Sequence, residues 1–180
     1  MMKRIGIFDT ETTDLVKNRI TALTRQPEIV AFYCGVYSPK GKLVDELDFK
    51  VKPKRPMTPE NIAIHGITNE ELAERPSFSK YAKTVIAFMQ GCDRVVAHNL
   101  SFDRDMVEIE LDRLALPMRW PPGICTVEQS QSITGQRINL SDLHGYLFGK
   151  RFDEAHTAHA DGAALARCYF ELVKRGYIIQ

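Results

Sequence analysis

The chain has 180 residues, of which 44% are hydrophobic and 26% are charged, and its formal net charge is +1. These values are typical of a single globular domain, residues 1–180, and exclude a disordered chain or a strongly basic nucleic-acid-binding tail. No apolar run approaches the roughly 18 residues of a membrane span, and four scattered cysteines without a CxxC pair favour a reducing, cytoplasmic compartment over zinc or disulfides.

The first half of the chain predicts three strands followed by three helical segments. The strand candidates are rich in β-branched and aromatic residues or alternate in polarity, and they cover residues 4–11, 28–38 and 42–53. The helical segments cover residues 58–66, 68–74 and 77–91. Pro59 and Gly66 bound the first segment, Thr68 and Glu71 form a capping box in the second, and Ser77 is the expected cap of the third.

The second half predicts one more buried strand and then mostly helices. Residues 93–99 have the composition of a short strand, and a helix over 101–116 is expected to end before Pro117. "PPGICT" interrupts the helical pattern and leaves room for one further short strand. The remaining helical segments cover residues 127–133, 139–149 and 156–176. This order predicts an α/β domain with mixed strand directions.

The first strand carries two carboxylates on one face. Residues two apart in a strand point to the same side, so Asp9 and Glu11 continue the face of Ile5 and Ile7, with Cα atoms about 6.5 Å apart. A lone Asp-x-Glu more often marks a solvated strand tip. Its meaning therefore depends on other acids in the chain.

Two further aspartates begin core-facing helical stripes. Asp103 precedes Val107, Leu111 and Leu114, and Asp161 precedes Leu165, Cys168, Tyr169 and Leu172. Burying an unpaired carboxylate costs several kcal/mol, of which a helix N-terminus offsets only about 0.3–2 kcal/mol. Asp105 falls off the stripe and is expected at the surface.

Four inward-pointing acids repel one another unless cations join them. Oxygen ligands of this kind suit Mg²⁺ or Mn²⁺, and pairs of such ions act on phosphates. His156 lies in the segment that enters the last helix, where a neutral imidazole can take a proton from water. A structural or surface role for His156 is the alternative. His159 is about 200° around the helix from Asp161 and should face away.

Three motifs in order, "FDTETTDL", "AHNLSFD" and "HTAHAD", resemble those of the DnaQ-like 3′–5′ exonucleases, the DEDDh branch of the ribonuclease-H-like fold. "IHGIT", between the first two, resembles another segment of that family, and the likeness spans residues 5 to about 175. The resemblance implies a ribonuclease-H-like, mixed five-stranded sheet flanked by helices.

The resemblance also implies a role for each matched residue. Two Mg²⁺ or Mn²⁺ ions would be held by Asp9, Glu11, Asp103 and Asp161, with Asp9 shared, and His156 would be the general base. The 3′-terminal nucleotide would be bound by Thr12, Leu15, His65 and Phe102. Ordinary core packing is the alternative for Leu15 and Phe102.

The chain departs from the family pattern in two places. Asp14 stands where glycine is usual, and aspartate tolerates the left-handed conformation that a turn needs there. The segment 16–27 is longer than a tight hairpin, and its Lys17, Arg19 and Arg25 are candidates for phosphate contacts. A solvated loop without function is the alternative.

The resulting hypothesis is a two-metal-ion 3′–5′ exonuclease that releases nucleoside 5′-monophosphates from single-stranded or frayed DNA, in proofreading or repair. A DNA polymerase is a possible partner, and a bacterial or phage protein would be nucleoid-associated. The alternatives are a 3′–5′ exoribonuclease, if the pocket accepts a 2′-OH, and a catalytically silent nucleic-acid-binding module.

Overall fold

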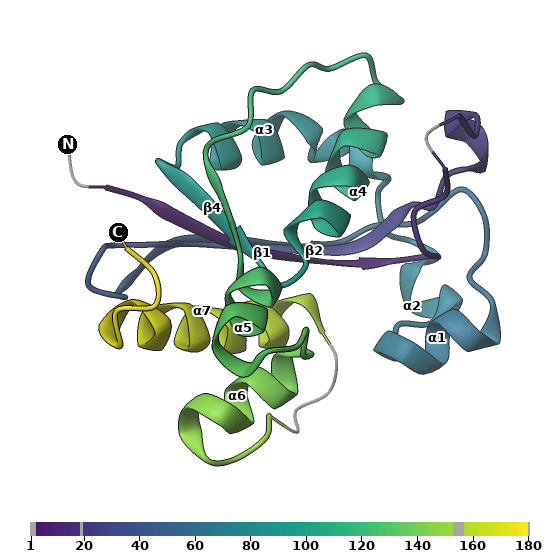
Figure 1. The fold of residues 1–180 in the computed structure, drawn as a ribbon. Coiled ribbons are helices and arrows are strands. Elements are labelled where there is room, and N and C mark those ends of the chain that lie inside the picture. Colours follow the sequence, from purple (N-terminus) through teal and green to yellow (C-terminus); the bar gives the residue numbers. More distant parts are fainter. Residues whose placement is uncertain (1–2, 19, 153–156, 180) are drawn as a thin grey trace.

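A computed structural model describes residues 3–18, 20–152 and 157–179 (Figure 1). Its strands are β1 (Ile5–Thr12), β2 (Ile29–Tyr37), β3 (Leu43–Lys50), β4 (Arg94–Ala97) and β5 (Gly123–Cys125). They form a five-stranded sheet in the order β3-β2-β1-β4-β5. The pairs β1-β2 and β2-β3 are antiparallel, whereas β1-β4 and β4-β5 are parallel. The mixed five-stranded sheet is therefore confirmed.

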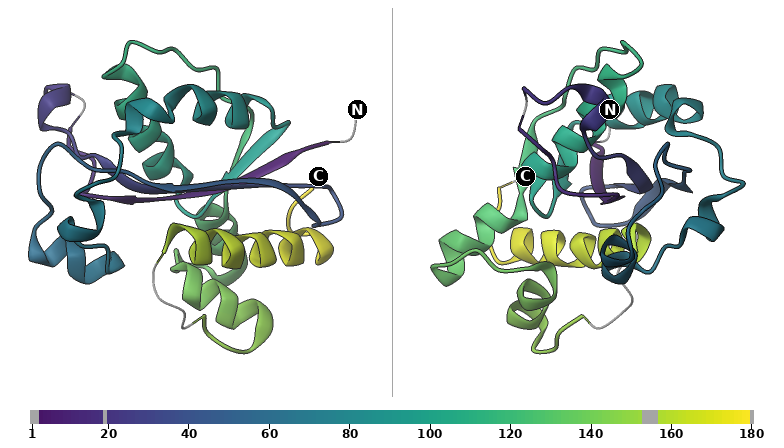
Figure 2. Two further views of the ribbon diagram at one scale, coloured as in Figure 1. Left: turned by 180° about the vertical axis from the view of Figure 1, so that it is seen from behind. Right: turned by 90° about the vertical axis from the view of Figure 1, so that its right-hand side faces the viewer.

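Helices cover both faces of this sheet. They are α1 (Pro59–His65), α2 (Asn69–Leu72), α3 (Ala82–Gln90), α4 (Leu100–Asp112), α5 (Thr126–Thr134), α6 (Leu140–Phe148) and α7 (Ala158–Lys174). Figures 1 and 2 show α3 and α4 over one face, α7 over the other with α5 and α6 outside it, and α1 and α2 beyond the end of β1. None of the helices in the described ranges combines the length and apolarity needed to cross a bilayer.

The central strand β1 is packed on both faces. Phe8 belongs to a core built with α3 and α4, whereas Ile5 and Ile7 belong to a second core built with α6 and α7. Full burial of such a side chain stabilises the fold by roughly 1.5–3 kcal/mol. Side chains alternate between the two faces of β1, so this packing determines against which helices each residue after Phe8 lies.

Most of the expected helix boundaries are present. Thr58 caps α1, Pro59 opens it, and Gly66 ends it in the left-handed conformation at φ 72°. Thr68 Oγ1 accepts the Glu71 N–H at 3.2 Å. The Glu71 carboxylate pairs with Lys50 Nζ at 2.5 Å, so the capping box forms only in part.

Two helix predictions are wrong in their boundaries. Ser77 does not cap a helix, because its hydroxyl bonds Ser79, and a 3₁₀ turn, η2 (Phe78–Lys80), precedes α3. The helix before Pro117 ends earlier, at Asp112. Ala115 takes φ 52° there, and the Leu116 N–H returns to the Leu111 carbonyl at 3.1 Å. Leu114 consequently leaves the buried stripe and is 36% exposed.

Candidate active site

Three carboxylates meet at the end of β1. Asp9 and Glu11 continue the face of Ile5 and Ile7, which packs against α7. Asp161 lies in the first turn of α7, whose start is fixed by Thr157 Oγ1 accepting the Ala160 N–H at 3.1 Å. One ligand oxygen from each of Asp9, Glu11 and Asp161 lies within 4.8 Å of the others. A register shift between Glu11 and Thr12 ends the regular pairing beside this cluster.

Asp103 approaches the same strand from the opposite face of the sheet. Its Oδ1 accepts the Thr10 hydroxyl at 2.8 Å and the Thr10 N–H at 3.1 Å. Thr10 follows Phe8 on the α4 side of β1, so the pair is buried in the layer opposite Asp161. Sequence reasoning missed Thr10, although its alternation with Asp9 is the signal that places it on the α4 side.

Burial and neighbouring carboxylates raise the pKa values of Asp9 and Glu11, and burial raises that of Asp103. Desolvation is the largest cause of the raised pKa of Asp9, followed by the charges of Asp103, Glu11 and Asp161. Burial and the charge of Asp161 raise the pKa of Glu11 to about 7. Burial also raises the pKa of Asp103 to about 7, against the lowering effect of its bonds from Thr10. The ionised cluster is therefore unfavourable without added positive charge.

The donor set fits divalent cations. All four groups offer carboxylate oxygens, the ligands that Mg²⁺ and Mn²⁺ prefer. Within the described residues, neither Asp9 nor Glu11 forms an ion pair with a lysine or arginine. The cluster of Asp9, Glu11 and Asp161 is therefore a candidate site for a divalent cation.

Gly162, next to Asp161, brings α7 unusually close to the sheet. A Cβ built at Gly162 would lie 2.2 Å from Cδ1 and 2.5 Å from Cε1 of Tyr33. The Tyr33 ring is 1% exposed and held between β2 and α7, so it has no room to move aside. The absence of a side chain at Gly162 thus sets the height of Asp161 above β1.

We expect Gly162→Ala to destabilise the protein by about 1–3 kcal/mol, because overpacking against Tyr33 outweighs the helix propensity of alanine. Gly145→Ala in α6 is the matched control, since the nearest atoms to the added Cβ belong to Arg151 and lie 3.5 Å or more away. The control should be neutral or stabilising by up to about 1 kcal/mol. Urea denaturation midpoints measure both, and equal midpoints would contradict the close contact.

The predicted nucleotide-binding residues lie in different surroundings. Leu15 is 73% exposed, so core packing does not explain it. Phe102 is half-buried and packs against the α3–α4 core. The Thr12 hydroxyl donates to the Asp14 carbonyl at 2.9 Å. His65 Nδ1 accepts the Ile67 N–H at 3.1 Å, and burial lowers the pKa of His65 while the backbone of Thr12 opposes that shift.

Two histidines precede Asp161 in the third motif, and the structure describes one of them. His156 lies outside the described residues. His159 is exposed and its Nδ1 lies 3.0 Å from Asp48 Oδ2, so it faces away from Asp161 as predicted.

Asp14 does not take the left-handed conformation. In the described chain, the non-glycine residues with positive φ are Asn99 and Ala115. Its Oδ1 accepts the Leu15 N–H at 2.8 Å, so a side-chain hydrogen bond shapes this turn instead. Its carboxylate lies 3.6 Å from Lys17 Nζ.

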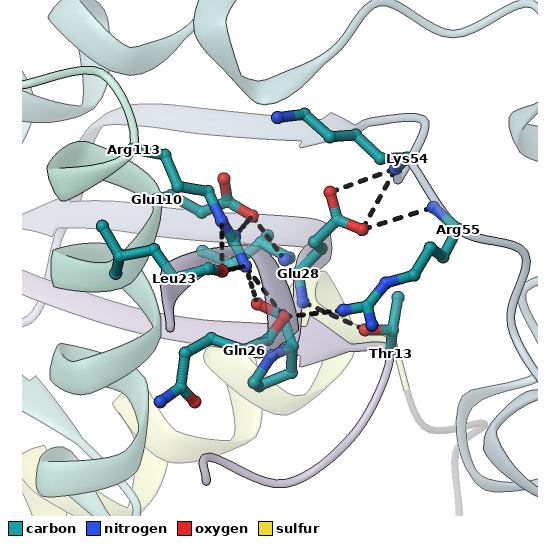
Figure 3. Close-up of polar contacts among 10 residues, drawn as sticks. Thr13, Leu23, Gln26, Glu28, Lys54, Arg55, Glu110 and Arg113 are labelled. Carbon is teal, nitrogen blue, oxygen red and sulfur yellow. Dashed lines mark hydrogen bonds and ion pairs between the residues drawn. The ribbon is translucent and has the colours of Figure 1, made fainter. Parts of the chain in front are cut away.

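The 16–27 segment is held by buried polar contacts and is not a merely solvated loop; Arg19 lies outside the described residues. Gln26 binds the Asn18 carbonyl at 3.0 Å and accepts the Lys17 N–H at 3.0 Å. Arg113, directly after α4, donates to the carbonyls of Leu23, Gln26 and Pro27 at 2.8–3.0 Å (Figure 3). This network joins the loop after β1 to the helix that carries Asp103, and sequence reasoning missed it.

Comparisons with known proteins agree with this geometry. The family model RNase_T, described as an exonuclease, matches residues 7–169. The DNA polymerase III subunit epsilon of Pasteurella multocida is 33% identical over 130 residues, which are 68% of this chain and 50% of that protein. The chain thus spans about half the length of that curated relative.

Two solved structures are similar over nearly the whole chain. Exonuclease X in complex with 5′ overhanging duplex DNA is 26% identical, with a TM-score of 0.69 over 96% of this chain and 93% of that one. The nuclease domain of 3′hExo, a DEDDh family member bound to rAMP, has a TM-score of 0.76 at 17% identity and covers 99% of this chain and 96% of its own. The second likeness concerns the fold alone.

Proposed function

The chain belongs to the RNase_T exonuclease family, and we propose that it is a metal-dependent 3′–5′ exonuclease acting on DNA. The observation that carries this proposal is the cluster of Asp9, Glu11 and Asp161 at the end of β1, with Asp103 bound to the neighbouring Thr10. Exonuclease X, solved with duplex DNA, supports the choice of DNA as substrate. The similarity to a DNA polymerase III subunit supports a polymerase as partner.

In the proposed site, the carboxylates bind the metal ions and the side chains around them bind the substrate. Asp9, Glu11, Asp103 and Asp161 would hold two Mg²⁺ or Mn²⁺ ions, which when bound supply Lewis-acid stabilisation of charge on the phosphate oxygens. Thr10 fixes the orientation of Asp103 through two hydrogen bonds. The exposed Leu15, with Thr12, His65 and Phe102, contacts the 3′-terminal nucleotide and aligns its phosphate.

His156 acts as the general base in this proposal. It takes a proton from the attacking water as the water oxygen bonds to the terminal phosphorus. The bond between that phosphorus and the 3′ oxygen of the preceding nucleotide breaks, and the leaving oxygen takes a proton from solvent. The products are a nucleoside 5′-monophosphate and a strand one nucleotide shorter.

The test is digestion of 3′-labelled single-stranded DNA and of RNA with the same sequence, with Mg²⁺ or with EDTA. We expect labelled mononucleotide from DNA with Mg²⁺ and none with EDTA. Faster release from RNA would identify an exoribonuclease instead. No metal-dependent release from either substrate would identify a nucleic-acid-binding module without catalysis.

Replacing His156 by alanine should lower kcat by about 10²–10⁴-fold and change KM little, because proton transfer contributes to the transition state and not to binding. His159→Ala is the matched control, since His159 belongs to the same motif but is exposed beside Asp48. It should change kcat less than about twofold. Steady-state kinetics on labelled DNA measures both, and an unchanged kcat in His156→Ala would refute the assignment.

A further inference from the structure

Two segments meet beside the end of β1 through Glu28. The Glu28 carboxylate accepts the Lys54 N–H at 3.0 Å and the Arg55 N–H at 3.3 Å. The Glu28 main chain pairs with Thr13, whose N–H donates to the Glu28 carbonyl at 2.9 Å and whose Oγ1 accepts the Glu28 N–H at 3.0 Å (Figure 3). Residues 52–56 are thereby fixed relative to Thr13, which follows Glu11 by two positions.

A groove lies between these segments and the end of α4. Its volume is about 350 Å³, and its wall includes Thr24, Lys54 and Arg55. The wall also includes Glu28, Arg113 and Asp112. The Glu28 carboxylate accepts backbone N–H groups, and Arg113 pairs with Glu110 and donates to three carbonyls. The groove charges that can act on a ligand are therefore the positive charges of Lys54 and Arg55 and the negative charge of Asp112.

The cations at this end of the sheet divide into paired and unpaired groups. Lys17 pairs with Asp14 and Lys50 pairs with Glu71. Lys54 and Arg25 are exposed, and neither side chain has an ion-pair partner in the described part of the chain. Arg25 directly follows Thr24 in the groove wall. Positive charge without a partner is therefore found on both segments that border the groove.

The loop that carries Arg25 is held in place by the side chains of Arg55 and Arg113. Arg55 Nη2 donates to the Gln26 carbonyl at 2.9 Å, and Arg113 holds the same carbonyl at 2.8 Å. The backbone beside Arg25 is thus fixed before any ligand arrives, which reduces the entropy lost on binding. A preformed cationic groove next to a site for a 3′ end suits the backbone of the strand that leads into it.

We propose that this groove, with Arg25, Lys54 and Arg55, binds phosphates of the substrate strand upstream of the terminal nucleotide. The proposal rests on the exonuclease function proposed above. Such contacts release counterions from the nucleic acid, so their contribution falls with salt, by a slope of about 0.7 per contact for a single strand. They also act only on substrates that possess upstream phosphates.

The test compares Arg25→Ala/Lys54→Ala with the charge-matched control Lys42→Ala/Lys83→Ala, whose lysines are exposed on the β2–β3 turn and on α3. The substrates are a single-stranded 20-nucleotide DNA and the p-nitrophenyl ester of thymidine 5′-monophosphate, which has no upstream phosphate. We expect the ratio of kcat/KM for DNA to that for the ester to fall about tenfold in the first variant only. Its dependence of log kcat/KM on log salt should weaken by roughly 1.4, for two contacts.

The result separates this inference from the proposed function. An unchanged ratio and salt slope, with wild-type protein active on both substrates, overturns the groove and leaves the exonuclease standing. If wild-type protein hydrolyses neither substrate, the exonuclease fails, and binding of the fluorescent 20-nucleotide DNA in EDTA still tests the groove. Weaker binding by Arg25→Ala/Lys54→Ala than by the control then supports it, and equal binding overturns it.

Discussion

Replacing Asp9 by asparagine is expected to abolish turnover and to raise the thermal stability of the metal-free protein. In the proposed site Asp9 is a ligand shared by both ions, so its loss would remove several kcal/mol of transition-state stabilisation, which corresponds to about 10³-fold or more in kcat. Stability changes in the opposite direction, because Asp9 is desolvated and faces three other acids. Each kcal/mol of relieved repulsion raises Tm by about 2–4 °C in a protein of this size.

The pH dependence follows from the raised pKa values. A carboxyl whose pKa is higher in the folded than in the unfolded state favours folding at low pH, and that contribution is lost as pH rises through the folded value. For Glu11 and Asp103 the folded value is about 7. The Tm of wild-type protein in EDTA should therefore fall between about pH 4.5 and pH 7 and level off at higher pH. Saturating Mg²⁺ should remove most of that fall.

Activity assays and thermal melts on Asp9→Asn measure both effects, with Asp45→Asn as control. Asp45 is exposed on β3, and its carboxylate accepts the Glu46 N–H at 3.0 Å. The control should keep wild-type activity and a Tm within about 1–2 °C of wild type, which corresponds to about 0.5 kcal/mol. An Asp9→Asn protein that retains a tenth of the wild-type kcat, or that melts earlier in EDTA, contradicts the charge cluster as described.

Arg113→Ala is expected to lower the free energy of unfolding by about 3–5 kcal/mol, because it leaves a buried carboxylate without its cation. Arg113 Nη1 lies 2.9 Å from Glu110 Oε1, and the two side chains are only 10% and 9% exposed. Burial raises the pKa of Glu110, and Arg113 is the main influence that lowers it. The carbonyls of Leu23, Gln26 and Pro27 lose their donor in the same variant.

A matched control lies on the same helix. Arg104 forms an exposed pair with Glu108 at 2.9 Å, so Arg104→Ala should cost less than about 1 kcal/mol. In the double variant Glu110→Gln/Arg113→Ala no charge remains unpaired, and part of the loss should return. Urea denaturation gives the free energies, and hydrogen exchange of residues 20–27 reports the loop. A loss in Arg113→Ala equal to that in Arg104→Ala would refute the buried network.

The relation between Asp9, Glu11 and Asp161 was predictable because local periodicity determines it. The two-residue repeat of β1 predicts which of its faces is buried, and the stripe of Leu165, Cys168 and Tyr169 predicts which side of α7 is buried. These two buried surfaces pack against each other, which brings the carboxylates together. Helical periodicity predicted that the Asp103 side chain points inward, but not on which face of the sheet it lies. That depends on the Thr10 hydroxyl and N–H donating to Asp103, 93 positions away in the chain.

The loop network was beyond local patterns. Gln26, Glu28, Glu110 and Arg113 are residue types usually found at the surface. Here the first three are buried and the Arg113 side chain is only 10% exposed, through contacts with segments far along the chain. The end of α4 was missed for a different reason: Pro117 is a strong breaker, but Ala115 turns the chain first in a conformation that alanine rarely adopts. Pairings and turns of this kind depend on tertiary contacts, which periodicity does not encode.

The arrangement of the four acids in two opposite layers has a consequence for protein synthesis. Asp9 is made early, Asp103 reaches it from one side of the sheet, and Asp161 reaches it from the other only after α7 has been made and has docked. A nascent or partly unfolded chain with α7 undocked thus holds an incomplete ligand set. In the proposed exonuclease, hydrolysis would therefore require that α7 has docked onto the sheet.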